Sequence, residues 1–436
     1  MADFARSADP AVQAQLDRLG SSIYSEDVLG LERIAALLDR LGRPQDRIPP
    51  VFHVAGTNGK GSTCAFLRSA LEAAGHKVHM FTSPHLVRYN ERIRLSGALI
   101  EDEMLAPLLA EVQDAGAGLG ATFFEVTTAA AFLAFSRVPA DAVILEVGLG
   151  GRLDATNVIE RPLVTGIASL ALDHQQYLGR RMIDIAGEKA GIAKKGVPLV
   201  TQIYPPAIAG RIGEVAHDMG AQWVPRGGDW DAIVSRGKLR YSDRQGTLDL
   251  PLPRLPGRYQ AMNAALAVAM IRHQSVLAVP QSSLGAAMGW AHWPGRLQQL
   301  GSGLLIERLA KGSELWIDGG HNPSASRLVA AHATRNWNDG LPLTLLFASL
   351  KSKDAEATLS PFRTVAAGVR TLPIPGHDSR DPGDLAAMAR GMGLEASPHP
   401  TLDEALDAVE GPARILVYGS LYLAGTALAA NGTLPD

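Results

Sequence analysis

The chain has 436 residues, of which 46% are hydrophobic and 19% charged, a composition typical of globular proteins and far from that of disordered ones. At roughly 150 residues per domain, this length predicts two or three domains, each able to bury a core. Lysine and arginine number 41 and aspartate and glutamate 44, so the net charge is −3. Bulk charge therefore does not favour nucleic acid as a partner, and any anion site must be local.

Three further features narrow the class of protein. The single cysteine, Cys64, excludes an internal disulfide, a CxxC redox pair and a cysteine-based zinc site. The first residues, MADFARSADPAVQAQ, contain no apolar core, so we expect no signal peptide. The longest apolar run, 129–135, is far too short to cross a bilayer. We therefore expect a cytoplasmic protein with neither a membrane nor a nucleic-acid partner.

The first half of the chain alternates between predicted strands and helices. An amphipathic helix is expected over Glu26–Leu41. After it, short apolar runs predict buried strands and longer periodic stretches predict helices, which together favour a parallel sheet covered on both faces. The strands are expected at 51–56, 76–83, 141–148, 161–169 and 196–202, and the helices at 62–74, 101–115, 125–135 and 182–193.

The second half contains a change of pattern and then a new alternation. Asp229–Leu252 alternates apolar and polar residues between Arg-Gly and Gln-Gly turns, which predicts a small antiparallel meander. A helix over Gln260–His273 follows, and WPGRLQQL, 293–300, is typical of a hinge. Expected strands at 314–318, 343–350, 369–375 and 413–419 predict a second, smaller α/β domain. The predicted domains are 1–297 and 298–436.

The strongest chemical signal is HVAGTNGKGST, 53–63, where an apolar strand enters a turn with three glycines and a lysine. Glycines let backbone N–H groups converge on a phosphate, and the helix that follows adds the positive end of its dipole. Lys60 supplies a point charge for the β and γ phosphates. The usual spacing GxxxxGK[ST] is not met, because Val54 stands in place of the first glycine and Gly61 separates Lys60 from Ser62. On this loop alone, an ordinary glycine-rich turn remains an alternative.

A second signal is Glu146, a lone carboxylate at the end of an apolar strand. Burying an unpaired charge costs free energy, so such a group is expected to meet a cation or a cluster of donors. In a nucleotide enzyme the cation would be Mg²⁺, which prefers oxygen ligands. The alternative is a helix N-cap or an ion pair with Arg152.

Polar residues also follow two other predicted strands. Asp173 and His174 come after the strand at 161–169, at the edge where open α/β sheets bind ligands, although a lone histidine is more often a satisfied core or surface residue. In the C-terminal half, Asp318 ends a strand, and His321 and Asn322 precede a helix, which is typical of a ligand loop. Asp318 would there pair with a ribose or a metal-bound group.

Lys189 is a different case. It lies in a predicted helix beside Glu188, and a lysine in such a place normally belongs to a solvated face. Composition and periodicity alone leave it with that interpretation.

Taken together, these segments resemble, in chain order, the motifs of the folylpolyglutamate synthase/dihydrofolate synthase family in its bacterial bifunctional type. That family belongs with the Mur ligases among the ATP-dependent amide ligases. The resemblance spans about 53–425 and includes the irregular phosphate loop, since GTNGKGS is the family's own form. The segments are HVAGTNGKGS, TSPHL, EVGLGGRLDATN, LDH, GEKAGI, PGRYQAMNAALA, WPGR, DGGHNP and VYGSLYLAG.

The resemblance implies an α/β fold with a P-loop-type, mostly parallel sheet in the N-terminal domain and a smaller Rossmann-like α/β domain after it. It also implies that ATP converts a carboxylate to an acyl phosphate, which the amine of L-glutamate attacks to give an amide, ADP and phosphate. The implied substrates are 7,8-dihydropteroate and reduced folates, and we expect a monomer.

The resemblance assigns roles residue by residue. Two Mg²⁺ ions are expected, on Ser83, Glu146, His174 and Lys189, the last being a lysine that the family carbamylates. The pterin is expected to contact Phe124, Asp154 and Ala155. Lys60, Lys189, His174 and Arg296 are the expected catalytic residues, and Arg296 would stabilise charge on the transferring phosphate. The ATP contacts are expected at Gly56, Thr57, Asn58, Gly59, Lys60, Gly61, Ser62, Asn263, Arg296, Asp318 and His321.

Some alternatives stay open. FASLKSKD, 347–354, departs from the family segment at Lys351 and Ser352, which leaves the glutamate contacts unassigned. The alternative enzymes are a folylpolyglutamate synthase without the second activity and a Mur-type amino-acid ligase, although Mur-type ligases generally carry threonine where this chain has Gly61. A regulatory or motor P-loop ATPase would explain neither DGGHNP nor the second domain.

Overall fold

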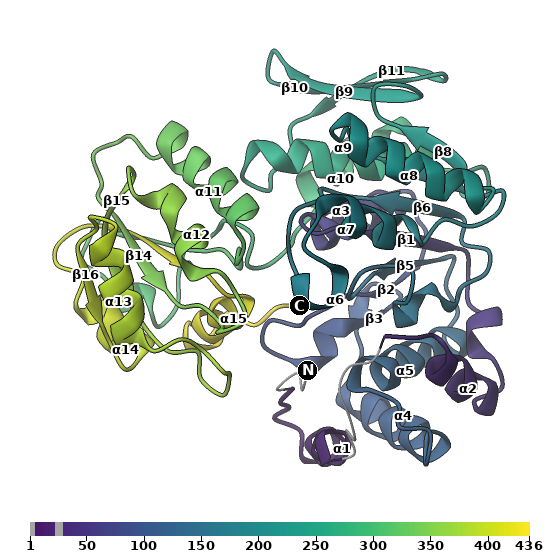
Figure 1. Cartoon of the computed structure of the whole chain (residues 1–436), viewed down its shortest axis with the longest axis horizontal. Coiled ribbons are helices and arrows are strands. Elements are labelled where there is room, and N and C mark those ends of the chain that lie inside the picture. Colours follow the sequence, from purple (N-terminus) through teal and green to yellow (C-terminus); the bar gives the residue numbers. More distant parts are fainter. Residues whose placement is uncertain (1–4, 22–28) are drawn as a thin grey trace. The chain divides into compact units, whose positions relative to one another are not determined.

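The computed structural model describes residues 5–21 and 29–436, which form two compact units (Figure 1). The first unit contains the described residues up to 254, together with 260–292 and residue 436, and the second contains 255–259 and 293–435. The second unit thus begins at Trp293, inside the predicted hinge segment. It also includes Leu255–Tyr259, because Tyr259 packs against the hydrophobic core of that unit.

The first unit is built on an eight-stranded sheet. Its strands are β1 (Val51–Ala55), β2 (Val78–Phe81), β3 (Ile93–Leu95), β4 (Ala98–Leu99), β5 (Ala142–Glu146), β6 (Val164–Ile167), β7 (Pro198–Thr201) and β8 (Gln222–Pro225). Their order is β4-β3-β2-β5-β1-β6-β7-β8, parallel from β2 to β8, with β3 and β4 antiparallel at one edge. The central strands β1 and β5 are buried along their whole length, as a sheet covered on both faces requires. The predicted parallel sheet is confirmed.

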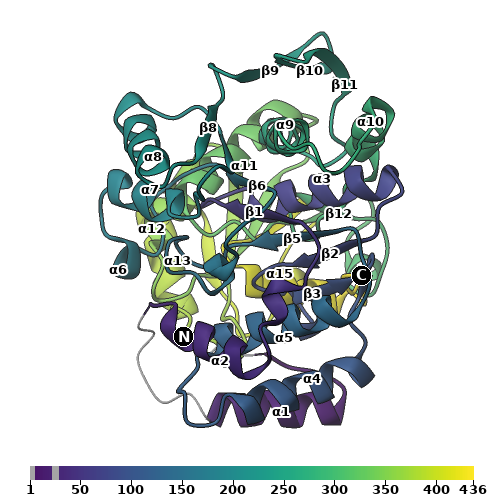
Figure 2. The same ribbon diagram turned by 90° about the vertical axis from the view of Figure 1, so that its right-hand side faces the viewer.

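Helices cover both faces of this sheet (Figure 2). On one side lie α1 (Pro10–Ser21), α2 (Glu32–Arg40), α4 (Asp102–Ala115) and α5 (Phe123–Arg137), which share a core with β1, β2, β3 and β5. On the other side lie α3 (Lys60–Ala73), α9 (Arg258–Arg272) and α10 (Gln281–Trp290). The short α6 (Gln175–Leu178) precedes α7 (Met182–Ala190), which packs against α8 (Pro206–Asp218). The unit also contains 3-10 turns at Pro44–Asp46, Tyr89–Arg92 and Ala155–Val158.

The predicted helices differ from the observed ones at their ends. The first amphipathic helix begins at Glu32, and residues 26–28 of the predicted range lie outside the described residues. Helix α3 begins at Lys60, two residues before the prediction, because Gly59 adopts φ +85° and forms its N-cap. Helix α7 ends at Ala190 instead of residue 193.

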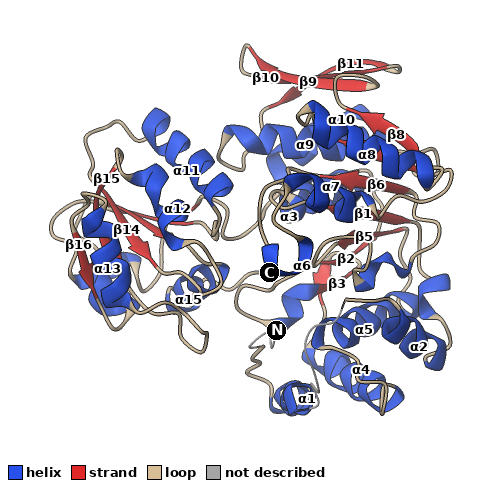
Figure 3. Cartoon of the chain, in the orientation of Figure 1, coloured by secondary structure: helices blue, strands red, loops and turns tan. Residues whose placement is uncertain are grey.

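The predicted meander is confirmed as a separate three-stranded antiparallel sheet (Figure 3). Its strands are β9 (Trp230–Ser235), β10 (Lys238–Asp243) and β11 (Gly246–Pro251). Arg236 and Gly237 both have positive φ, as a two-residue hairpin turn requires. Asp243 fastens the meander to α9: its two carboxylate oxygens accept hydrogen bonds of 2.6 Å from Nε and Nη2 of Arg272.

The second unit has a six-stranded sheet in the order β12-β13-β17-β14-β15-β16, with only β12 antiparallel. The strands are β12 (Gln298–Leu300), β13 (Glu314–Ile317), β14 (Leu343–Phe347), β15 (Ala366–Thr371), β16 (Ala396–Pro398) and β17 (Arg414–Tyr418). The helices are α11 (Pro323–Asn336), α12 (Ala355–Leu359), α13 (Pro382–Gly391), α14 (Leu402–Asp407) and α15 (Leu421–Ala430), with 3-10 turns at Ile306–Arg308 and Ser360–Phe362. The predicted second α/β fold is therefore confirmed.

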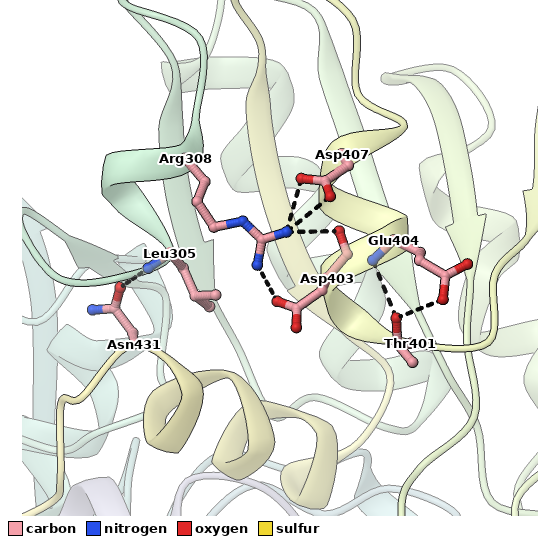
Figure 4. Close-up of polar contacts among 7 residues, drawn as sticks. All are labelled: Leu305, Arg308, Thr401, Asp403, Glu404, Asp407 and Asn431. Carbon is pink, nitrogen blue, oxygen red and sulfur yellow. Dashed lines mark hydrogen bonds and ion pairs between the residues drawn. The ribbon is translucent and has the colours of Figure 1, made fainter.

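Ion pairs hold the 3-10 turn at Ile306–Arg308 in place (Figure 4). Arg308 donates to the carboxylates of Asp403 and Asp407 on α14, the latter at 2.8 Å. Asn431 Oδ1 accepts a hydrogen bond of 3.0 Å from the Leu305 backbone. The segment between β12 and β13 is thereby tied to α14 and to the end of α15.

Within 5–21 and 29–436, no helix combines the length and the apolar character needed to span a membrane.

The Asp243–Arg272 pair generates the first prediction. Its side chains are 1% and 14% exposed, and removing one partner of a buried pair is strongly destabilising. Although burial opposes ionisation, the Arg272 guanidinium keeps the pKa of Asp243 below its usual value. We expect Asp243→Asn to lower the free energy of unfolding of the first unit by about 3 kcal/mol in denaturant titrations at pH 7. A carboxyl group whose pKa is depressed by folding contributes its full stabilisation above the unfolded pKa and loses it as the pH falls towards the folded pKa. The difference should therefore shrink as the pH falls below about 4.

The control is Asp249→Asn on the same meander. Asp249 pairs with Arg240, but both side chains are at least 40% exposed, so we expect a loss below about 1 kcal/mol. Equal losses for the two variants would contradict this account.

Candidate active site

The predicted phosphate loop, 56–62, lies at the carboxyl end of β1, between β5 and β6. A Cβ atom on Gly56 would lie 2.9 Å from that of Ala168, and one on Gly59 would overlap the side-chain oxygen of Asn263. Gly59 also has φ +85°, a conformation that favours glycine. Glycine is therefore required at both positions, and the structure places the predicted residue Asn263 directly against the loop.

Backbone hydrogen bonds join this loop to the segment after β6. The N–H groups of Thr57 and Asn58 both donate to the Ser169 carbonyl, at 2.8 and 3.1 Å, and Thr57 Oγ1 donates to the Ala171 carbonyl. The first N–H groups of a helix have no partner within it. The groups of Lys60, Gly61 and Ser62, in the first turn of α3, are thus the ones placed to bind an anion.

Lys60, the first residue of α3, lies close to Glu146 at the end of β5. Lys60 Nζ lies 4.0 Å from Glu146 Oε1 and donates to the Gly56 carbonyl at 3.2 Å. Glu146, only 5% exposed, also accepts a hydrogen bond of 3.3 Å from the backbone N–H of Ser83. The alternative ion pair with Arg152 is excluded, because Arg152 binds Glu188 at 2.8 Å.

The residues around Glu146 fit a magnesium ion. The contacts of its carboxylate with Lys60 and with the Ser83 backbone are long, at 4.0 and 3.3 Å, and Ser83 adds a hydroxyl oxygen of the kind that Mg²⁺ prefers. Among the described residues, no three His, Cys, Asp or Glu side chains gather into a metal-binding group. A metal here would therefore also need ligands of other kinds, such as the hydroxyl, a modified lysine or phosphate oxygens.

Lys189 is buried, contrary to the solvated face that its helix position suggested. Only 4% of the residue is exposed. Burial, together with the charge of Lys60, lowers the pKa of Lys189 to about 7. The nearby carboxylate of Asp173 acts in the opposite direction.

The glycine-rich loop after β5 packs directly on the helix that carries Lys189. A Cβ on Gly151 would lie 2.7 Å from the Glu188 carbonyl, and the Arg152 backbone donates to that carbonyl at 2.8 Å. Only a glycine allows this approach, so the loop and α7 are held together.

His174 ends the segment after β6 and precedes α6. It adopts φ +50°, unusual for a residue other than glycine, and its backbone N–H is bound at 2.8 Å by the Asp173 carboxylate. Asp173 therefore fixes the turn at His174 and contributes charge near Lys189, although it was not among the residues expected to bind Mg²⁺.

The three residues expected to contact the pterin lie in two adjoining segments. The ring of Phe124, at the start of α5, lies against Gly148, where a Cβ would overlap it. Asp154 and Ala155 are both buried in the loop after β5. Asp154 caps the 3-10 turn that begins at Ala155 and accepts a hydrogen bond of 2.8 Å from the Leu149 backbone.

The remaining expected nucleotide contacts belong to the second unit. Asp318 is buried, and its carboxylate accepts hydrogen bonds from the backbones of Leu297 and Gly320 at 2.9 and 2.7 Å. Burial raises the pKa of Asp318, while the neighbouring Arg296 opposes the rise. His321 Nδ1 lies 2.9 Å from the Gly319 carbonyl. Asp318 thus holds the turn that carries Arg296.

Glu91 organises the loop that begins at Ser83, and it was not predicted from the sequence. The Glu91 carboxylate accepts the backbone N–H groups of Leu86, Val87 and Arg88 at 2.7 to 2.9 Å and so shapes the loop that begins at Ser83. In the sequence it stands between charged neighbours in RYNERIR, a pattern that suggests a solvated surface, and no local signal marks it.

Comparison with known proteins gives consistent results, although no protein-family model matches the chain. The dihydrofolate synthase/folylpolyglutamate synthase of Escherichia coli (strain K12) is 37% identical over 81% of this chain and 80% of its own. The folylpolyglutamate synthase of Lacticaseibacillus casei is 33% identical over 90% of this chain and 92% of its own.

Solved structures are also similar to this chain. That of E. coli FolC in complex with DHPP and ADP has a TM-score of 0.86 and 32% identity over 97% of each chain. A bifunctional folylpolyglutamate synthase/dihydrofolate synthase with Mn, AMPPNP and L-glutamate bound has a TM-score of 0.85 and 30% identity, covering 98% of this chain and 99% of its own.

Gly59 generates the second prediction. We expect Gly59→Ala to abolish ADP binding in titration calorimetry, because the new Cβ would displace Asn263 and the loop. The matched control is Gly75→Ala: Gly75 has φ +89° but no atom within 4 Å of the added Cβ. That variant should carry similar backbone strain, of about 1 kcal/mol, and bind ADP normally. Normal ADP binding by Gly59→Ala would refute the loop assignment.

Proposed function

Because this chain belongs to the dihydrofolate synthase/folylpolyglutamate synthase family, we propose that it joins L-glutamate both to 7,8-dihydropteroate and to the glutamate tail of reduced folates. It is an ATP-dependent carbon–nitrogen ligase in this proposal. The observation that carries it is the close approach of Lys60, in the first turn of α3, to Glu146 at the end of β5, beside a glycine loop with the geometry of a phosphate-binding loop. The proposal includes a monomeric cytoplasmic enzyme whose partners are small molecules.

The first chemical step is phosphoryl transfer. An oxygen of the acceptor carboxylate forms a bond to the γ-phosphorus of ATP, and the bond between that phosphorus and the β–γ bridging oxygen breaks, which releases ADP. Little covalent work falls to the protein, so positioning and charge dominate. Lys60 Nζ and the N–H groups at the start of α3 meet the charge on the phosphates.

Ser83, Glu146, His174 and Lys189 would hold magnesium in this proposal. When bound, Mg²⁺ supplies positive charge that neutralises the phosphate oxygens during transfer. The backbone N–H of Ser83 donates to the Glu146 carboxylate, which holds the two residues beside each other.

The second step forms the amide. The neutral amine of glutamate attacks the carbonyl carbon of the acyl phosphate to form a tetrahedral intermediate. The bond from that carbon to the phosphate oxygen then breaks, phosphate leaves, and the nitrogen gives up one proton. Arg296 is proposed to stabilise charge on the phosphate. Asp318 positions Arg296 by accepting a hydrogen bond from the backbone of the next residue, Leu297. Both activities share this chemistry, because each joins a carboxylate to the same amine.

Lys189 is proposed to be carbamylated. The neutral amine is the form that attacks CO₂, giving the carbamate and one proton, and burial makes that form accessible near neutral pH. The carbamate would convert a buried amine into an oxygen ligand. Lys189 also lies close enough to Lys60 for its pKa to respond to that charge.

Lys60 provides the third prediction. We expect Lys60→Ala to reduce glutamate-dependent ADP formation at least about a hundredfold, because the charge on the phosphates loses its partner, while the melting temperature stays near that of the parent. Lys238→Ala, an exposed lysine on β10, is the control and should retain full activity. Near-normal ADP formation in Lys60→Ala would eliminate the proposed role.

Lys189 provides the fourth. Protein equilibrated with ¹³C-bicarbonate should show one carbamate resonance that Lys189→Arg removes, together with activity. Lys194→Arg is the control: burial lowers the pKa of Lys194 as well, but its Nζ donates to the Asn157 carbonyl at 3.0 Å. A resonance that persists in Lys189→Arg, or an active Lys189→Arg enzyme, would contradict carbamylation.

The fifth prediction tests the proposed pair of activities. Phosphate release should depend on glutamate with 7,8-dihydropteroate as the sole acceptor and, separately, with a glutamylated reduced folate. Activity with the folate alone would restrict the enzyme to polyglutamate synthesis. Phosphate release that does not depend on glutamate would favour the alternative of a P-loop ATPase. If neither acceptor supported phosphate release, the proposed function would be refuted.

A further inference from the structure

A buried chain of side chains links β1 to the loop after β5. His53, in the middle of β1, places Nε2 2.8 Å from Oγ1 of Thr156, and that oxygen lies 2.5 Å from Oδ1 of Asp154. His53 and Thr156 are fully buried, and Asp154 is 3% exposed. None of the predicted site assignments includes His53 or Thr156.

The direction of these hydrogen bonds follows from the chemistry of the groups. An ionised carboxylate only accepts, so the Thr156 hydroxyl donates to Asp154. The same oxygen must then accept from His53, which makes Nε2 the protonated nitrogen of the ring. Burial keeps His53 neutral by lowering its pKa to about 3. Its Nδ1 is consequently an unprotonated acceptor, and among the described residues it has no hydrogen-bond partner.

Asp154 is the point where this chain meets the loop. Its Oδ1 also accepts the Thr156 backbone N–H at 3.0 Å, and its Oδ2 accepts that of Leu149 at 2.8 Å. Both carboxylate oxygens are therefore oriented by the protein. The neighbouring Asn157 donates to the carbonyls of Arg152 and Gly191, which connects the same loop to the end of α7.

The histidine is costly to the fold. A buried acceptor without a partner is destabilising, and an apolar side chain would avoid it. In return, the donor on Nε2 leaves the Thr156 hydroxyl only one orientation. The phosphate loop begins at Gly56, one residue beyond β1, so the same strand carries both the phosphate loop and the group that orients Asp154.

We infer that His53 and Thr156 are positioning residues for the acceptor substrate, which they affect by holding Asp154 and the turn at Gly148–Leu149 in register with β1. This inference rests on the proposed function, in which Asp154, Ala155 and Phe124 form the pterin site. In this inference, His53 and Thr156 affect the binding of the acceptor substrate and do not affect the binding of nucleotide.

The test compares substitutions that remove or restore the hydroxyl. Thr156→Val should raise KM for both 7,8-dihydropteroate and the glutamylated folate about tenfold or more, the effect of one hydrogen bond to a charged group. The Kd for ADP should stay within about twofold of the parent value, and Thr156→Ser should restore the acceptor KM.

Thr165→Val is the matched control. Thr165 is equally buried in the neighbouring strand β6, and its hydroxyl donates to the Pro198 carbonyl at 3.1 Å, away from Asp154. It should lose a similar amount of stability and leave the acceptor KM unchanged. Equal rises in the acceptor KM for Thr156→Val and Thr165→Val would overturn the inference, as would an unchanged KM in Thr156→Val.

Substitutions of His53 keep the inference testable if Thr156→Val does not fold. His53→Gln retains an N–H donor and should keep the acceptor KM within about threefold, whereas His53→Leu should raise it about tenfold. Similar acceptor KM values for the two variants would overturn the inference. The unsubstituted enzyme distinguishes failure of this inference from failure of the proposed function. If it released no phosphate in a glutamate-dependent reaction, the proposed function itself would be refuted.

Discussion

The close approach of Lys60 and Glu146 is the constraint on which the site depends. The two groups lie 4.0 Å apart, Lys60 in the first turn of α3 and Glu146 at the end of β5. The two side chains are 16% and 7% exposed, so solvent screens their charges little, and a distance of 4.0 Å is long for a direct ion pair. The arrangement keeps a positive and a negative group available for phosphate oxygens and for a cation, respectively.

The order of the strands explains why these groups meet. Strand β1 lies between β5 and β6, so the segments after all three strands leave the same edge of the sheet. The phosphate loop is tied to the segment after β6 through the Ser169 carbonyl, and Glu146 is the last residue of β5. Gly59 and Gly151 then allow backbone and side chains to approach where any other residue would collide. The site is thus assembled by parallel strands and completed by close packing at glycines.

Much of this arrangement could be predicted from local pattern. Buried strands such as 141–148 and the meander were predictable because apolar runs and alternation report burial directly. Glu146 stood out because a carboxylate ended an apolar run. The edge strands β3 and β4 and the short β12 and β16 were not predicted, because strands of two or three residues carry too little periodicity.

Other features depend on contacts distant in the sequence. Lys189 lies in a helix beside Glu188 and looks solvated, yet the loop at Gly151 covers that helix and buries it. Tyr259 lies in the first turn of helix α9 but packs on the core of the second unit, which no local pattern indicates. Glu91 and His53 organise loops through hydrogen bonds to backbone and side chains that only the folded chain brings near.

The most direct test of carboxylate activation at Lys60 and Glu146 is transfer of oxygen from the acceptor to phosphate. The enzyme would be given 7,8-dihydropteroate labelled with ¹⁸O in its carboxylate, with ATP and L-glutamate, and the released phosphate analysed by mass spectrometry. An acyl phosphate predicts one labelled oxygen in each phosphate formed, because the bond from carbon to that oxygen breaks when the amide forms. Unlabelled phosphate accompanying amide formation would contradict the account.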